Sequence, residues 1–241
     1  MFGPFMFYID PYYLLLVLPA IILSIWASAR VNSTFKRYAD QYAKSRLTGA
    51  DAARRILDRN GLRYVRVVQT QGHLTDHYNP KDQTVYLSQS VYSSCSCSAI
   101  GVAAHEAGHA VQHAEEYVPL KIRSAIIPAT NFGAKLSVPL VLIGLLFYYW
   151  MDRPEYIMIA YAGVLLFSLT ALFQLVTLPT EYNASARALK ALDESGTLTR
   201  DELAKAKKVL SAAALTYVAA LLVSLMQLLR LLLMVRRNDR R

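Results

Sequence analysis

The chain has 241 residues, of which 54% are hydrophobic, and a formal net charge of +9. This composition leaves room for several membrane spans and one modest polar domain. Most of the cations lie beside apolar segments, as is typical of a membrane surface, so we expect a lipid bilayer and no nucleic acid as a partner. The expected fold class is a mostly α membrane protein with about four transmembrane helices and an α+β domain that contains a small β-sheet.

Four apolar runs predict the transmembrane helices. The first covers residues 12–29, and its start lacks the basic residues of a cleaved signal peptide, so we expect an uncleaved anchor. The second and third cover residues 136–151 and 156–178, separated by a tight polar turn that contains Pro154. The fourth covers residues 209–235 and is interrupted by Arg230.

Residues 30–135 are expected to form a polar domain. Residues 30–46 predict a basic helix, and residues 50–60 predict a second helix that begins after Thr48 and ends at Gly61. Alternating apolar residues in 63–70, 73–78 and 84–88 predict three strands. An edge strand of such a sheet could hold an extended peptide substrate, although a sheet that only packs fits the sequence equally well.

Residues 98–118, SAIGVAAHEAGHAVQHAEEYV, predict a buried helix rich in small apolar residues. His105 and His109 lie four residues apart, so their imidazoles share one helix face and can bind one metal ion. Glu106 lies just off that face, where its carboxylate can reach a water on the metal. This is the HExxH arrangement of zinc peptidases, so we expect residues 30–135 to form a zincin-like domain. A buried helix with satisfied polar groups would explain each histidine separately but not their spacing.

A catalytic zinc site needs a third protein ligand and one open position. His113 would lie about 12 Å from His105 along a continuous helix, which is too far. Glu181 is the better candidate, because it follows the third apolar run in a segment, residues 179–189, that resembles a helix start. If the first three spans each cross once, Glu181 emerges on the same side of the membrane as His105 and His109.

The distribution of cations predicts the side. Lys and Arg are frequent in residues 30–135 and 180–208, whereas the turn between the second and third spans has only Arg153. The positive-inside tendency therefore places the polar domain and the segment 179–208 in the cytoplasm. The basic tail after residue 230 conflicts with a fourth crossing, and the sequence leaves the side of the tail open.

Several separated motifs occur in one order: TGADAARRIL, LTDHYNP, TVYLS, VAAHEAGHAVQ and LPTEYNASARAL. Together they resemble the YugP-like neutral zinc metallopeptidases, four-pass bacterial membrane proteins that are more distantly similar to the HtpX and CAAX-protease gluzincins. The resemblance implies Zn²⁺ bound by His105, His109 and Glu181, with Glu106 as the general base, in a bacterial plasma membrane. Gluzincins commonly have an Asp four residues after the ligand Glu; here Ser185 stands in that position, which leaves Asp76, Asn183 or a backbone carbonyl as partners for the histidines.

The expected function is that of a zinc-dependent membrane endopeptidase that cleaves proteins or peptides, membrane proteins among them. Arg187, ranked first, His77 and Tyr182 are candidates to stabilise the oxyanion. The alternative is a non-catalytic membrane adaptor or assembly factor with a structural zinc site, and partner subunits in the membrane are a further expectation. A small transporter has less support, because the apolar runs carry almost no ionisable residues.

Overall fold

A computed structural model describes residues 10–239. The chain divides into two compact units: a first unit formed by the described residues of 1–26, 123–176 and 217–241, and a second unit formed by residues 27–122 and 177–216. Four helices are long and apolar enough to cross a membrane, Tyr13–Ala39, Val118–Met151, Pro154–Glu194 and Arg200–Asp239. The four predicted spans coincide with parts of these helices, and the mostly α fold class with a small sheet is confirmed.

The first unit consists of apolar helix segments. It contains the π-helical turn η1 (Tyr13–Val17), most of α5 (Val118–Met151), the 3₁₀ turn η2 (Pro154–Tyr156), and parts of α6 (Ile157–Glu194) and α7 (Arg200–Asp239). Small residues allow close packing here: a β-carbon on Gly144 would lie only 3.0 Å from Cα of Ala160. Arg230, the cation inside the fourth apolar run, forms an ion pair with Asp10 at 2.6 Å, so its charge is neutralised within the unit.

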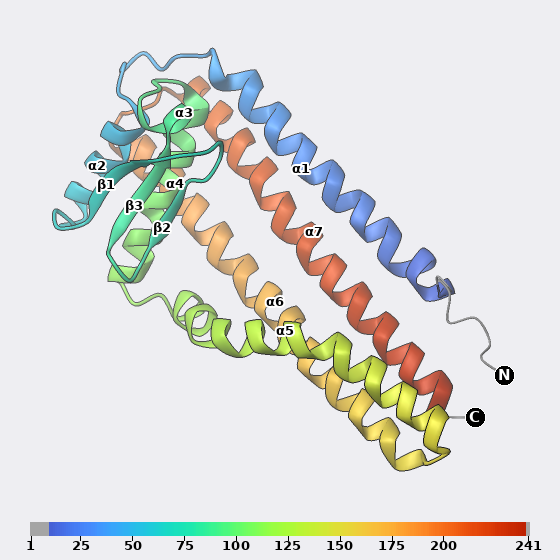
Figure 1. The fold of residues 1–241 in the computed structure, drawn as a ribbon. Helices are drawn as coiled ribbons and strands as arrows, with labels where there is room; N and C mark the ends of the chain where they lie inside the picture. The colour runs from blue at the N-terminus through green and yellow to red at the C-terminus, as the bar shows by residue number, and fades with distance from the viewer. Residues whose placement is uncertain (1–9, 240–241) are drawn as a thin grey trace. The chain divides into compact units, whose positions relative to one another are not determined.

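The second unit contains the sheet and the HExxH helix (Figure 1). Its elements are the end of α1 (Leu18–Ala39), α2 (Gly49–Arg59), β1 (Arg66–Thr70), β2 (His77–Asn79), β3 (Thr84–Ser88), α3 (Gln89–Tyr92), α4 (Cys97–Ala114) and segments of α6 and α7. The strand order is β1-β3-β2, with β1 parallel and β2 antiparallel to β3. Val85, at the centre of the sheet, pairs with Val67 on one side and Tyr78 on the other.

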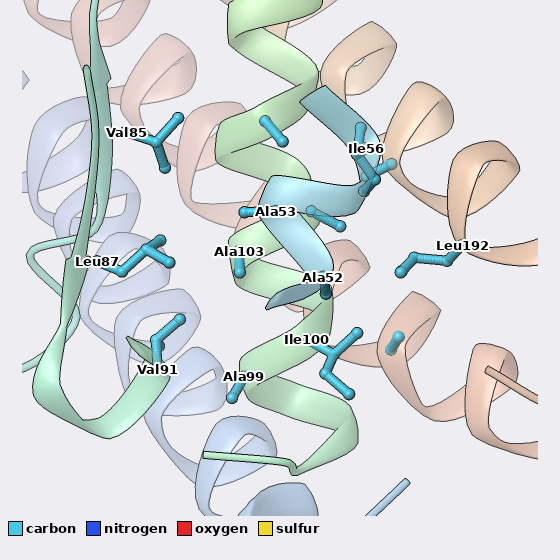
Figure 2. Close-up of a cluster of buried hydrophobic side chains, with 14 of the residues drawn as sticks. Ala52, Ala53, Ile56, Val85, Leu87, Val91, Ala99, Ile100, Ala103 and Leu192 are labelled. Carbon is cyan, nitrogen blue, oxygen red and sulfur yellow. The ribbon is translucent and has the colours of Figure 1, made fainter. Parts of the chain in front are cut away.

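The core of the second unit is built around α4. Figure 2 shows side chains of α2, β3 and α4 meeting in one cluster, and Leu192 of α6 joins it. Alternate β3 residues Val85 and Leu87 are fully buried in this cluster, as expected for a central strand with one face on a helix. The sheet and α2 thus hold the HExxH helix at the centre of the unit.

Local signals set several helix boundaries as predicted. Thr48 and Asp51 form a reciprocal capping box at the start of α2, and Gly61 follows its end with a positive φ of 74°. The predicted helix over residues 30–46 is wrong in its extent, because α1 ends at Ala39. The chain then leaves the helix to bond with the segment before α4: Ala43 donates its N–H to the carbonyl of Cys95 at 2.9 Å.

One expected helix boundary does not exist. The segment 179–189 resembles a helix start, but Pro179 lies inside the continuous helix α6. A proline inside a helix removes one backbone hydrogen bond, and it can kink the helix without ending it. Here Thr177 and Thr180, on either side of Pro179, are both buried, so packing on both sides of the proline favours a continuous helix.

Candidate metal centre

The HExxH residues lie on α4, a buried helix with a defined start. Ser96 caps its N-terminus by accepting a hydrogen bond from the N–H of Ala99 at 3.2 Å. The helix ends at Ala114, and Glu116 follows with a positive φ of 56°. Most residues of α4 are buried, which confirms the predicted buried helix up to Ala114, whereas the prediction is wrong for residues 115–118, which lie beyond its end.

A close approach between α4 and α6 determines the position of the histidines. Gly108 faces the backbone of α6, where a β-carbon at position 108 would lie 2.7 Å from the carbonyl oxygen of Ala184. His109 is the next residue on α4, and Glu181 lies about one turn before Ala184 on α6. The absence of a side chain at position 108 therefore allows the two helices to bring these ligand-type residues into contact.

Three side-chain atoms converge between the two helices. Nε2 of His105 lies 3.1 Å from Nε2 of His109 and 3.2 Å from Oε2 of Glu181, and the remaining distance, from His109 Nε2 to Glu181 Oε2, is 3.4 Å. His109 and Glu181 are buried and His105 is half-buried. The three residues therefore form a group that could hold a metal ion.

The hydrogen bonds behind His109 fix the orientation of its ring. Gln112 is fully buried, and its Nε2 group donates hydrogen bonds to the carbonyl of Thr180 at 2.9 Å and to Oδ1 of Asn183 at 2.8 Å. Its Oε1 must then accept from Nδ1–H of His109, at 3.0 Å. This tautomer leaves a lone pair on Nε2 of His109, directed at His105 and Glu181.

Ser185 lies behind the other histidine. Its Oγ is 3.0 Å from Nδ1 of His105. With Ser185 accepting from Nδ1–H, Nε2 of His105 also presents a lone pair to the centre of the group. Ser185 therefore occupies the hydrogen-bonding position behind His105 although it cannot supply the charge of an aspartate.

This donor set fits a zinc ion. Nitrogen and oxygen ligands of tetrahedral zinc lie about 2.0–2.2 Å from the ion and hence roughly 3.3–3.6 Å from one another. The three observed separations, 3.1, 3.2 and 3.4 Å, are close to these values. Three converging lone pairs repel one another unless a proton or a cation lies between them, and three protein ligands leave one coordination position open.

The charges around His109 favour a cation. Burial of the ring lowers its pKa, but the hydrogen bond with Glu181 and the negative charges of Glu106 and Glu181 outweigh burial, so the pKa of His109 lies above the ordinary 6.5. The surroundings that stabilise a proton on His109 also favour a divalent cation. Glu106 is 8% exposed, and its carboxylate has no hydrogen-bond partner among residues 10–239.

Asp76 contributes a second carboxylate near Glu106. Burial raises the pKa of Asp76 above 3.8; hydrogen bonds from Ser88 oppose this shift, and the charge of Glu106 adds to it. Asp76 accepts the N–H of Ser88 at 2.7 Å and also its hydroxyl. Asp76 therefore fixes the end of β3, and it has no hydrogen bond with His105 or His109 in the described part of the chain.

His113 lies outside the metal group. Its Nδ1 is 2.9 Å from the hydroxyl of Tyr78 on β2. Burial, with smaller contributions from Tyr64 and Asp82, raises the pKa of Tyr78 to about 12, so its hydroxyl keeps its proton at neutral pH. This contact ties the edge strand β2 to α4.

The oxyanion candidates have other partners. Arg187 forms an ion pair with Glu115 at 2.6 Å and donates to Asn183 at 2.7 Å, beside a groove of about 390 Å³. His77 stacks on Tyr86, with ring centroids 4.8 Å apart, and is exposed. Within residues 10–239, neither Arg187 nor His77 forms a hydrogen bond or ion pair with the three converging residues, and Tyr182 is 49% exposed. Their suggested roles remain predictions.

Gln112 is the residue of this site that the sequence analysis missed. It lies three residues after His109, at a spacing that places both side chains on one helix face. A glutamine in an otherwise small and apolar helix was the available signal. Asn183, named in advance as a possible partner of the histidines, bonds to Gln112 instead.

The chain is similar to proteins described as zinc metallopeptidases and membrane proteases. The model of a family described as "Putative neutral zinc metallopeptidase" matches residues 13–236. The chain is 46% identical over 218 residues to the "Putative membrane protease YugP" of Bacillus subtilis (strain 168), an alignment that covers 90% of this chain and 94% of that protein. No solved structure gives a significant match.

Proposed function

The chain belongs to the neutral zinc metallopeptidase family, and from this premise we propose that it is a zinc-dependent, membrane-embedded endopeptidase. The observation that carries the proposal is the convergence of three lone-pair-bearing atoms, from His105, His109 and Glu181, beside the unbonded carboxylate of Glu106. A group of metal ligands alone would fit a structural site. A buried, available base next to it supports hydrolysis.

His105, His109 and Glu181 are the proposed metal ligands. Gln112 and Ser185 orient the two imidazoles, so that both Nε2 atoms point to one position. When bound, zinc would supply Lewis-acid chemistry that polarises a peptide carbonyl and increases the acidity of water. The Glu106 carboxylate takes the proton of the attacking water and can deliver it to the leaving amine.

The substrate is proposed to be an extended protein segment. β2 is an edge strand that packs on α4, so its open edge offers backbone groups close to the HExxH helix. Arg187, His77 and Tyr182 remain the proposed donors to the oxyanion. Arg187 would have to exchange its partner Glu115 for the substrate in order to act.

The proposed location is a bacterial plasma membrane, with the second unit in the cytoplasm. Two observations support this location: the four apolar helices and the membrane assignment in the name of the Bacillus subtilis relative. The concentration of Lys and Arg in residues 30–135 and 180–208 supports the cytoplasmic side. Membrane proteins with unfolded segments are the proposed substrates.

The test is proteolysis by the purified full-length protein in detergent. We expect cleavage of a denatured membrane protein, loss of cleavage with a chelator, and recovery with zinc. Glu106→Gln should keep the zinc and lose the cleavage. If the zinc-loaded wild-type protein cleaves no denatured protein or peptide, or if Glu106→Gln cleaves at the wild-type rate, the proposal is wrong.

A further inference from the structure

A basic groove lies between α1 and α7 within the second unit, and nothing in the peptidase function uses it. Its volume is about 610 Å³. The residues of α1 that line the groove, at positions 30, 34, 37 and 38, share one helix face. The lining residues of α7, between positions 204 and 215, also share one helix face. The polar lining residues are Arg30, Thr34, Arg37, Tyr38, Lys207, Lys208 and Ser211.

The groove presents hydrogen-bond donors and positive charge. Four of its lining residues are cations and none is a carboxylate. Arg37, Lys207 and Lys208 form no ion pair with any residue of 10–239, whereas the neighbouring Lys205, which does not line the groove, is paired with Asp201 at 2.6 Å. Such a set of donors matches an anion with several acceptor oxygens, of which phosphate is the common biological example.

The position of the groove along both helices indicates the source of the phosphate. Arg30 directly follows the first apolar run of the sequence, and Lys208 directly precedes the fourth. Arg30 and Lys208 line the same groove. The end of the apolar segment of α1 therefore lies at the same level as the start of the apolar segment of α7. If these segments cross a bilayer, the groove lies at the level of the lipid headgroups.

We propose that this groove binds the phosphate of an anionic phospholipid headgroup. Arg37, Lys207 and Lys208 supply the charge, and the hydroxyls of Thr34 and Ser211 supply further donors. Ala212 and Leu215, which lie within the fourth apolar run, continue the groove along α7 and offer a surface for the start of an acyl chain. The proposal depends on the membrane spans and is independent of catalysis.

The test measures lipid adducts of the full-length protein by native mass spectrometry. The protein in a neutral detergent is titrated with short-chain phosphatidylglycerol, short-chain phosphatidylcholine, or inorganic phosphate alone. We expect the wild-type protein to retain phosphatidylglycerol over phosphatidylcholine. The triple variant Arg37→Gln, Lys207→Gln, Lys208→Gln should bind phosphatidylglycerol about tenfold more weakly or worse, because each cation near an anionic headgroup adds to the attraction.

Two further variants separate a site from net charge and from misfolding. Lys36→Gln, Arg55→Gln, Arg200→Gln removes the same number of charges from exposed positions outside the groove and should bind like the wild-type protein. Arg37→Lys, Lys207→Arg, Lys208→Arg keeps the charges and should also retain binding. Equal loss in both charge-removing variants, or no preference for the anionic lipid, overturns the proposal. Inorganic phosphate that binds as tightly as the lipid would show a soluble ligand instead.

Discussion

Gly108 of α4 and Ala184 of α6 are in such close contact that a β-carbon at position 108 would lie 2.7 Å from the Ala184 carbonyl oxygen. The neighbours of this contact are His109 on one helix and Glu181 and Ser185 on the other. The separation of the two helices therefore sets the separation of the proposed metal ligands. We therefore expect the proposed metal site across the two helices to depend on Gly108.

Gly108→Ala should weaken metal binding and stability together. The added methyl group would clash with the backbone of α6, and shifting that backbone costs free energy. We therefore expect a loss of about 1–3 kcal/mol in the free energy of unfolding, as for other overpacked cores. Zinc content per protein and thermal unfolding with and without zinc measure the two effects. Gly101→Ala is the matched control on the same helix, because its β-carbon would meet the Ala206 side chain at 3.2 Å, where a small shift suffices. Unchanged zinc content in Gly108→Ala would contradict the role of this contact.

Glu106→Gln should separate metal binding from catalysis. The substitution keeps the size of the side chain but removes the base, so the cleavage rate should fall by about 10²–10⁴-fold. Zinc content should stay at the wild-type value, because Glu106 is not one of the three converging residues. Glu116→Gln, at an exposed position just beyond the same helix, is the control and should cleave normally. Peptide hydrolysis and metal analysis on the same samples give both readouts.

The sequence predicted the features that depend on local patterns. Thr48 and Asp51 identified the start of α2, the alternation in residues 84–88 identified β3, and the spacing of His105 and His109 identified the face of α4 that meets Glu181. Each of these signals lies within one or two helical turns or one strand. Hydropathy likewise predicted the apolar helices, since their composition alone carries that information.

The sequence failed where tertiary packing overrides a local signal. Pro179 resembles a helix start, yet burial on both sides of it keeps α6 continuous. The bond from Gln112 to the carbonyl of Thr180 joins residues 68 positions apart, and no local pattern predicts such a pair. The family pattern suggests Asp76, Asn183 or a backbone carbonyl as the partner of the histidines, but the position of Ser185 on α6 places its hydroxyl beside Nδ1 of His105.

Gln112→Met should weaken zinc binding without removing a ligand. Methionine fills a similar volume but cannot accept from His109, so the ring loses its fixed tautomer and orientation. Loss of such an indirect partner of a metal ligand typically costs about 10–100-fold in metal affinity. Competition with a zinc chelator of known affinity measures the change. Asn183→Ala is the graded control: Gln112 keeps its bond to Thr180, so the loss should be smaller. Equal affinities for Gln112→Met and the wild-type protein would exclude the proposed orienting role.

Asp76→Asn should stabilise the protein in a pH-dependent way. Burial raises the pKa of Asp76 in the folded state above 3.8, the value expected in the unfolded chain. Between these two pKa values the folded protein binds more protons than the unfolded one, so the stability of the wild-type protein falls as pH rises through this window. Asparagine cannot ionise, and its Oδ1 can still accept the N–H of Ser88. The variant should therefore match the wild-type protein below pH 3.8 and unfold at a higher temperature above the folded pKa.

Asp82→Asn is the control of opposite sign for this measurement. The pKa of Asp82 is lowered, chiefly because its carboxylate accepts a hydrogen bond from the Tyr86 hydroxyl at 2.8 Å. A lowered pKa contributes stability that is present above pH 3.8 and is lost as pH falls through the folded value. Asp82→Asn should thus be less stable than the wild-type protein at neutral pH, where Asp76→Asn is more stable. Thermal unfolding of the three proteins in a chelator, so that metal release does not contribute, compares them. If Asp76→Asn were destabilised at neutral pH, the ionised carboxylate would be needed to hold Ser88 at the end of β3.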